Sequence, residues 1–168
     1  MDIELNPPDE GSTGRWVVVA DGARARLFET NRNAPGLRPV LPYDLTGSRL
    51  RDRDRGSDRA GYGHQSAGHG GSTLEPQTDP VDHEQDLLAR EVAHVLAHGR
   101  NEHRVDAIVL VAAPAFLGRL RRAIDSQTRA LVVAEDHRDL SRLPEHELEG
   151  RIPVEVWVDG EPPPRRRS

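Results

Sequence analysis

Two groups of arginines are the most prominent polar feature of this sequence. The first group precedes a Gly-rich stretch and consists of Arg49, Arg51, Arg53, Arg55 and Arg59. The second group falls within one predicted helix and consists of Arg119, Arg121 and Arg122. Arginine binds phosphate through two parallel donors and stacks on bases, so both groups suggest RNA binding. Aspartates alternate with the first group, and a solvated loop of internal ion pairs is an equally simple interpretation.

Histidines offer a second kind of candidate site. Glu91, His94 and His98 have helical spacing and could present two imidazoles to a metal ion. On a helix, however, His94 falls nearly opposite Val92, on the face expected to meet solvent. We therefore predict no metal site and keep His94 and His98 only as weak candidates for one.

Catalytic motifs are difficult to find in the chain. A two-metal nuclease needs several converging carboxylates; Glu84, Glu91 and Asp136 are available, but Asp21 is expected in a turn and Ala107–Ala112 contains no acid. The sequence contains neither a Gly-x-Ser-x-Gly elbow nor a Gly-Lys-Ser/Thr phosphate loop. We assign no catalytic residue and expect no cofactor, and a metal-dependent hydrolase or nuclease is the weakest alternative.

The elements that position these residues begin with a hairpin. The run that starts at Trp16 is apolar on both faces and predicts a strand buried on both sides. Asp21-Gly22 then predicts a type I′ hairpin turn, and Ala23–Phe28 predicts the returning strand. The stretch Leu37–Asp44 contains two prolines, which place a third strand at a sheet edge or at a bulge.

A long polar stretch separates this hairpin from the second half of the chain. Thr46–Gln77 has no apolar periodicity and predicts a flexible loop. Asp79 and Pro80 then have the residue types of a helix cap and first position, and Gly99 suggests the end of that helix.

Strands and helices alternate in the second half. The continuous apolar runs Ala107–Ala112 and Leu131–Ala134 predict buried parallel strands, and a helix bearing Phe116 and Leu120 separates them. The resulting fold class is α/β, a ribonuclease H-like mixed sheet of three antiparallel strands followed by alternating helices and parallel strands. We expect a disordered arm over residues 1–14, one domain over 15–152, and a C-terminal extension over 153–168, in which Pro153–Val158 could add an edge strand.

Composition excludes several classes of protein. The 168 residues are 35% hydrophobic and 30% charged, and the net charge of −5 argues against a uniformly basic nucleic-acid binder. The absence of cysteine excludes disulfide and thiolate chemistry. With no signal-peptide pattern and no apolar run long enough for a bilayer, we expect a cytoplasmic protein without a membrane partner.

Four stretches together resemble the bacterial host attachment protein family, the proteins required for attachment to host cells. They are WVVVADGARARLFE at Trp16–Glu29, Asp-Arg-x-Gly at Asp58–Gly61, VLVAAPAFLGRLR at Val109–Arg121 and VVAEDHRDLSRLP at Val132–Pro144. The residues at the family-motif positions are Asp21, Gly22, Asp58, Gly61, Pro114, Phe116, Leu117, Gly118, Arg138 and Asp139. The chain departs from the usual motif at Ala115, where the family has proline, and at Arg138, where it has lysine.

The family is distantly similar to the middle domain of archaeal and eukaryotic peptide-chain release factors. In that domain a Gly-Gly-Gln loop between the early strands and the first long helix enters the peptidyl-transferase centre. This chain has Gly63-His64-Gln65 and Gly70-Gly71-Ser72 in the equivalent place, and neither is Gly-Gly-Gln. The resemblance implies a non-catalytic ribosome- or RNA-associated binding module.

The candidate RNA- or ribosome-binding residues are Arg51, Arg53, Arg55, Arg59, His64, Gln65, Gly70, Gly71, Arg119, Arg121 and Arg122. The alternative is a protein-interaction factor that acts in surface or host attachment. Partners from two classes, RNA or the ribosome and another protein, are therefore both open, and the sequence does not predict the oligomeric state.

Overall fold

The structure is a computed structural model that describes residues 3–8, 10, 12–31, 36–50, 52–53 and 79–152. Its strands are β1 (Ser12–Ala20), β2 (Arg24–Asn31), β3 (Leu37–Pro39), β4 (Leu45–Thr46), β5 (Ala107–Ala112) and β6 (Val132–Asp136). Its helices are α2 (Pro80–Asn101), α3 (Pro114–Ala123), α4 (Ser126–Arg129) and α5 (Glu145–Leu148), and residues 47–50 and 52–53 are also helical.

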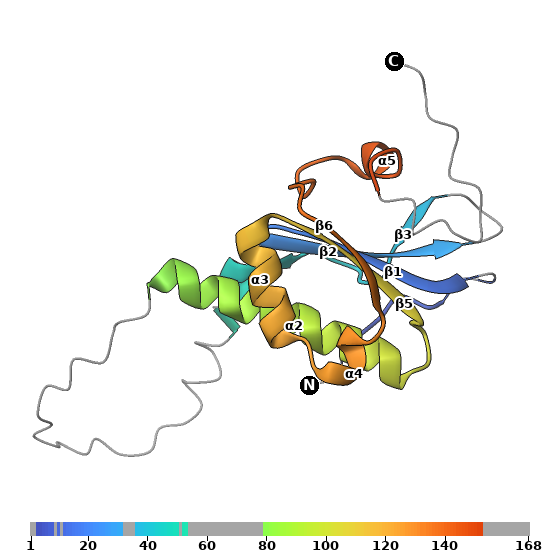
Figure 1. Cartoon of the computed structure of the whole chain (residues 1–168), viewed down its shortest axis with the longest axis horizontal. Helices are drawn as coiled ribbons and strands as arrows, with labels where there is room; N and C mark the ends of the chain where they lie inside the picture. Colours follow the sequence, from blue (N-terminus) through green and yellow to red (C-terminus); the bar gives the residue numbers. More distant parts are fainter. Residues whose placement is uncertain are drawn as a thin grey trace, which may run out of the picture.

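One sheet organises these elements, with strand order β3-β2-β1-β5-β6 and with β4 also paired to β2 (Figure 1). The strands β1, β2 and β3 are antiparallel neighbours, whereas β1, β5 and β6 are parallel to one another. In register, Val18 of β1 lies opposite Leu27 of β2 and Leu110 of β5. The predicted fold class, a mixed α/β sheet of this order, is confirmed.

The core lies on both faces of the sheet. Trp16, Val18 and Ala20 of β1 belong to the larger cluster, which the apolar sides of α2 and α3 cover. Val17 and Val19 belong to a smaller cluster on the other face with Leu148 of α5. Figure 1 shows α2 and α3 together on one side and α5 on the opposite side. The predicted strand buried on both sides is therefore confirmed.

The hairpin turn differs from the prediction. Among the described residues, positive φ occurs only at Gly14, Gly36 and His103, so the turn at Asp21-Gly22 is not type I′. Instead the Asp21 carboxylate accepts hydrogen bonds from the following backbone N–H groups, an Asx turn that needs no left-handed residue. The hairpin itself is confirmed.

Helix α2 begins as predicted but ends later. Asp79 accepts a hydrogen bond from the Val81 N–H, and Pro80 is the first helical residue. The helix then continues past Gly99 to Asn101. Gly99 is buried, and a Cβ there would overlap the ring of Trp16. Close packing against the sheet, and not helix termination, therefore explains this glycine.

Three further boundaries are corrected by the structure. Of the predicted strand over Leu37–Asp44, only Leu37–Pro39 is a strand, β3, and the next strand, β4, begins at Leu45, beyond the predicted range; both pair with β2. The predicted loop does not begin at residue 46, because Thr46 is in β4 and helical turns follow. Most of that predicted loop, residues 51 and 54–77, and the extension over residues 153–168 lie outside the described residues.

The predicted disordered arm is also wrong for residues 3–8. Ile3 and Leu5 pack against the larger core cluster. The Asn6 backbone N–H donates to the Val40 carbonyl at 2.8 Å, and Arg104 donates to the Asn6 carbonyl at 2.8 Å. The apolar side chains of Ile3 and Leu5 alternate with polar side chains in the sequence. This alternating pattern is too short to predict a packed segment. Within the described ranges, no helix has the length and apolar character needed to cross a bilayer.

Candidate functional site

Four of the family-motif residues lie at the carboxyl edge of the three parallel strands. Asp21 follows β1, Pro114 follows β5, and Arg138 and Asp139 follow β6. Ala20 and Ala112, the last residues of β1 and β5, are register partners, so the segments that leave these strands start side by side. Ligands of open α/β sheets bind at this edge, which makes it the candidate functional site.

Asp21 is the most heavily hydrogen-bonded group at this edge. Its Oδ1 accepts from the N–H groups of Ala23 at 2.7 Å and Arg24 at 2.8 Å, and its Oδ2 accepts from the Ser141 hydroxyl at 2.6 Å. Partial burial raises the pKa of Asp21, but these hydrogen bonds and the charge of Arg24 outweigh it, so the pKa lies below its usual value. The carboxylate is therefore a fixed anion that joins the hairpin turn to the segment after β6.

Ser141 connects two family-motif carboxylates and was not among the predicted site residues. It is fully buried, and its Oγ also lies 2.7 Å from Asp139 Oδ1. The Ser141 N–H donates to the same Asp139 oxygen at 3.1 Å. The Asp-x-Ser spacing is typical of an Asx turn and was the available signal, but the contact with Asp21 spans 120 positions of sequence.

Arg138 anchors the chain that leaves this edge. Its guanidinium donates to both carboxylate oxygens of Asp136, at about 3 Å from Nε, and to the Arg151 carbonyl at 2.6 Å. The hydrogen bonds from Arg138 lower the pKa of Asp136, although burial opposes them. A bidentate contact of this kind requires the planar guanidinium, so the lysine that is usual in the family motif at this position could not make the same contact with Asp136.

The motif residues of α3 are mainly structural. Pro114 is the first residue of the helix, and Phe116 and Leu117 are buried in the core between α3 and the sheet. Gly118 differs from them, because a Cβ at this position would meet nothing within 4 Å. Neither packing nor positive φ explains Gly118 within the described residues.

The predicted arginine groups are brought against carboxylates. Arg119 pairs with Asp82 and Asp86 of α2, both at 2.6 Å, and Arg121 pairs with Glu135 of β6. Arg53 pairs with Glu91 at 3.1 Å, and Arg122 is exposed. The structure thus separates Arg119 from Arg121 instead of gathering them, and RNA binding by these residues stays a prediction.

Several candidate residues lie outside the described part of the chain. They are Arg51, Arg55, Asp58, Arg59, Gly61, His64, Gln65, Gly70 and Gly71. The weak metal candidates are described: His94 is exposed and His98 is half-buried on α2. In the described ranges, no three His, Asp or Glu side chains are placed to hold a metal ion together.

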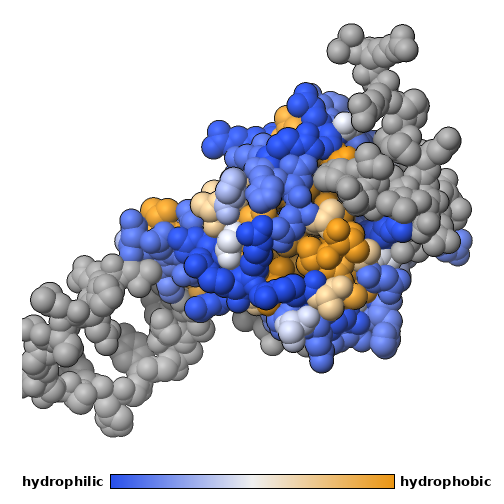
Figure 2. Space-filling view, viewed as in Figure 1, coloured by the Kyte–Doolittle hydropathy of each residue, from blue (hydrophilic) through white to orange (hydrophobic). Residues whose placement is uncertain are grey.

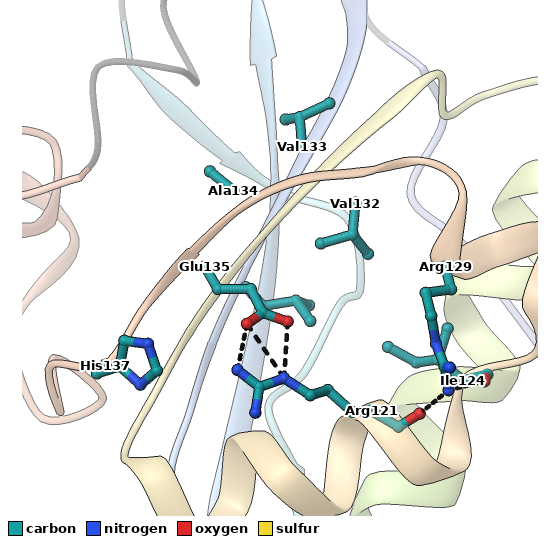
Figure 3. A pocket seen from close by; sticks show the side chains of 9 residues that line it. Arg121, Ile124, Arg129, Val132, Val133, Ala134, Glu135 and His137 are labelled. Atoms are coloured by element: carbon teal, nitrogen blue, oxygen red, sulfur yellow. Dashed lines mark hydrogen bonds and ion pairs between the residues drawn. The ribbon is translucent and has the colours of Figure 1, made fainter.

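A groove of about 590 Å³ lies between β6 and the helices α3 and α4, and the sequence did not suggest it. Leu110, Ile124 and Val132 supply its apolar lining, and Arg121 and Glu135 face each other across it (Figure 3). Figure 2 shows hydrophobic side chains gathered on this face of the molecule. Val133 of β6 is 55% exposed, although its apolar run predicted a buried strand.

Comparison with known proteins identifies the chain at the level of its family. A family model described as "protein required for attachment to host cells" matches residues 16–152. The match begins in β1 and ends at the last described residue, so it includes the whole sheet core and all the motif residues at its carboxyl edge. No curated protein matches the chain in a direct sequence comparison. The chain belongs to the family of proteins required for attachment to host cells.

Proposed function

We propose that this chain is a non-catalytic ribosome- or RNA-associated binding module whose binding segment lies between residues 53 and 79. The observation that supports the proposal most is that both ends of the segment are attached to one helix. Before it, Arg53 pairs with Glu91 of α2; after it, Asp79 caps the first turn of α2. Helix α2, the longest of the described helices and packed on the sheet, therefore holds both ends of the segment.

The sequence of the segment supports RNA as its ligand. Glycines there allow a close backbone approach to RNA, the preceding arginines can neutralise phosphates, and His64 or Gln65 would be the polar tip. Because Gly-Gly-Gln is absent, we expect binding without efficient peptidyl-tRNA hydrolysis. The occupied oxygens of Asp21 agree with a structural role for that carboxylate.

Cosedimentation with ribosomes over a range of salt concentrations tests the proposal. The variant Arg51→Ala, Arg53→Ala, Arg55→Ala should bind more weakly than the wild type and with a flatter salt dependence. Each phosphate contact to single-stranded RNA contributes roughly 0.7 to the slope of log affinity against log salt, so three lost contacts lower it by about 2.

A second triple variant provides the matched control. Arg38→Ala, Arg90→Ala, Arg142→Ala removes the same charge from exposed positions elsewhere. It should bind almost as the wild type does. Equal weakening in both variants would show that only net charge matters, and absence of wild-type association at low salt would contradict the proposal.

The second candidate function is a protein-interaction factor that acts in attachment. The observation that favours it is the exposed Val133 beside an apolar groove, because exposed apolar patches mark interaction surfaces. Two results together would favour the protein-interaction function over ribosome or RNA binding. The wild type would not associate with ribosomes at low salt, and Val133→Asp would abolish binding of the wild-type protein to a partner protein.

A further inference from the structure

The N-terminal segment, residues 3–8, occupies a surface of the folded core in the manner of a bound peptide. Ile3 and Leu5 are partly buried and pack against the larger core cluster, whereas Glu4 between them is exposed. Apolar side chains at alternate positions are typical of an extended segment with one buried side. Figure 1 shows the N-terminus on the side of the sheet that α2 and α3 cover.

Asn6 attaches this segment to the chain that leaves β3. Its backbone N–H donates to the Val40 carbonyl at 2.8 Å, and its side-chain amide donates to the Pro39 carbonyl at 3.0 Å. The Val40 N–H in turn donates to the Leu27 carbonyl of β2 at 2.9 Å. Asn6 therefore adds one more backbone contact outside the sheet, and the addition of an extended peptide to a sheet edge is a common mode of peptide recognition.

Arg104 is an anchor for the segment that the core itself holds in place. Its guanidinium donates to the Asn6 carbonyl at 2.8 Å, lies 3.5 Å from the buried Glu29 carboxylate, and sits 5.8 Å from the centre of the Trp16 ring. Because Glu29 and Trp16 belong to the sheet, the anchor is organised in advance for an incoming carbonyl. Within the described residues, the buried Arg104 Nε and Trp16 Nε1 have no acceptor. The segment thus leaves donors at this anchor unused.

We propose that this surface is a binding site for an extended peptide of another protein, and that residues 3–8 are its internal competitor. The partner peptide carries two apolar residues separated by one polar residue and followed by asparagine, as in the stretch IELN at Ile3–Asn6. The backbone contacts with Val40 and Arg104 accept any sequence, whereas the apolar positions and the amide select this pattern. Since the chain's own segment is tethered, it competes at a high effective concentration and keeps the site closed.

Fluorescence anisotropy with a labelled peptide of residues 1–8, MDIELNPP, tests the proposal in the full chain. The variant Ile3→Asp, Leu5→Asp should bind the peptide about tenfold more tightly than the wild type does, because aspartates at the two packed positions remove the internal competitor. Pro7→Asp, Pro8→Asp is the matched control, since it adds the same charge at exposed positions of the segment and should bind as the wild type does. Circular dichroism establishes that both variants are folded.

Changes in the peptide test its pattern without affecting the fold of the protein. A peptide with Leu5→Ser should bind the Ile3→Asp, Leu5→Asp protein several-fold more weakly, because it loses an apolar side chain that packs on the core. A peptide with Glu4→Gln changes only the exposed position and should bind almost as the original peptide does. Equal binding of the Leu5→Ser peptide, or no binding of the original peptide to the folded variant, would overturn the proposal.

The wild type provides a further measurement by nuclear magnetic resonance. In ¹⁵N-labelled protein, the Asn6 N–H should be protected from hydrogen exchange because it donates to Val40. Unlabelled peptide at about ten times its dissociation constant from the open site should speed this exchange about tenfold by capturing the open form. Unchanged exchange would contradict the proposal. A wild type that forms dimers by exchanging this segment would identify a second copy of the chain as the occupant and would also overturn it.

Discussion

Two glycines show how differently one residue type can be used in this protein. Gly99 of α2 lies against the ring of Trp16, which is fully buried at the centre of the larger core cluster. Gly118 of α3 has free space where a Cβ would be. Packing therefore explains the glycine at position 99 and does not explain the glycine at position 118.

Gly99→Ala should destabilise the protein, and Gly118→Ala should not. A methyl group at position 99 must displace the Trp16 ring, and overpacking of this kind typically costs about 1–3 kcal/mol, more than the helix propensity that alanine gains. Gly118→Ala should instead stabilise by roughly 0.5–1 kcal/mol. Urea denaturation midpoints at unchanged m-value measure both free energies of unfolding. A Gly99→Ala protein as stable as the wild type would contradict the packing argument.

At the scale of elements, arginine side chains hold neighbouring segments together. The chain contains no lysine, so all 23 of the residues counted as lysine or arginine are arginine. Arg26 donates to the Leu143 carbonyl, Arg100 joins α2 to Asp125 beside α4, and Arg119 joins α3 to the start of α2. A guanidinium has five donors in a fixed plane, so it can bridge a helix and a loop in one geometry.

Arg119→Ala tests this role against its neighbour Arg122. Arg119 is 18% exposed and pairs with two carboxylates, and partly exposed ion pairs contribute up to about 1 kcal/mol each. We expect Arg119→Ala to lose about 1 kcal/mol of unfolding free energy, and Arg122→Ala to stay within about 0.5 kcal/mol of the wild type. A double-mutant cycle with Asp86→Ala isolates the pair. A coupling energy near zero would show that the Arg119–Asp86 pair contributes nothing to stability.

The same elements show which parts of the structure could be predicted from sequence. The hairpin, the strands β5 and β6 and the start of α2 follow from local runs of residue types, and the structure has them, but of these two strands only β5 is buried as predicted. The partners of the arginines could not be predicted, because Asp82 lies 37 positions from Arg119 in the sequence. The turn type at Asp21-Gly22 was predicted wrongly, because residue propensities did not reveal that the Asp21 carboxylate accepts hydrogen bonds from the backbone N–H groups after it.

For the molecule as a whole, carboxylates at the loops join the outer segments to the sheet. Asp21 ties the hairpin turn to the segment after β6, Asp125 caps α4 and accepts from Arg100, and Asp136 holds Arg138. Hydrogen bonds to the charged forms lower the pKa values of Asp125 and Asp136. Glu135, whose pKa the hydrogen bonds from Arg121 lower, adds a fourth such group. Acid therefore weakens these four connections, and two of them, at Asp21 and Asp136, belong to the candidate site.

The protein should lose stability as the pH falls below about 4.5. A carboxyl whose pKa is lower in the folded state binds fewer protons when folded, so its contribution is present above the unfolded pKa and is lost as acid protonates it. The usual values here are 3.8 for Asp21 and 4.5 for Glu135. Urea denaturation at pH 7, 5, 4 and 3 measures this loss.

Asp21→Asn should flatten the acid dependence of the unfolding free energy, and Ser141→Ala should flatten it less, since the backbone N–H donors to Asp21 stay. Asp44→Asn, which removes an exposed carboxylate elsewhere, should leave the profile unchanged. An identical acid profile in the wild type, Asp21→Asn and Ser141→Ala would show that the Asp21–Ser141 contact contributes nothing to folding.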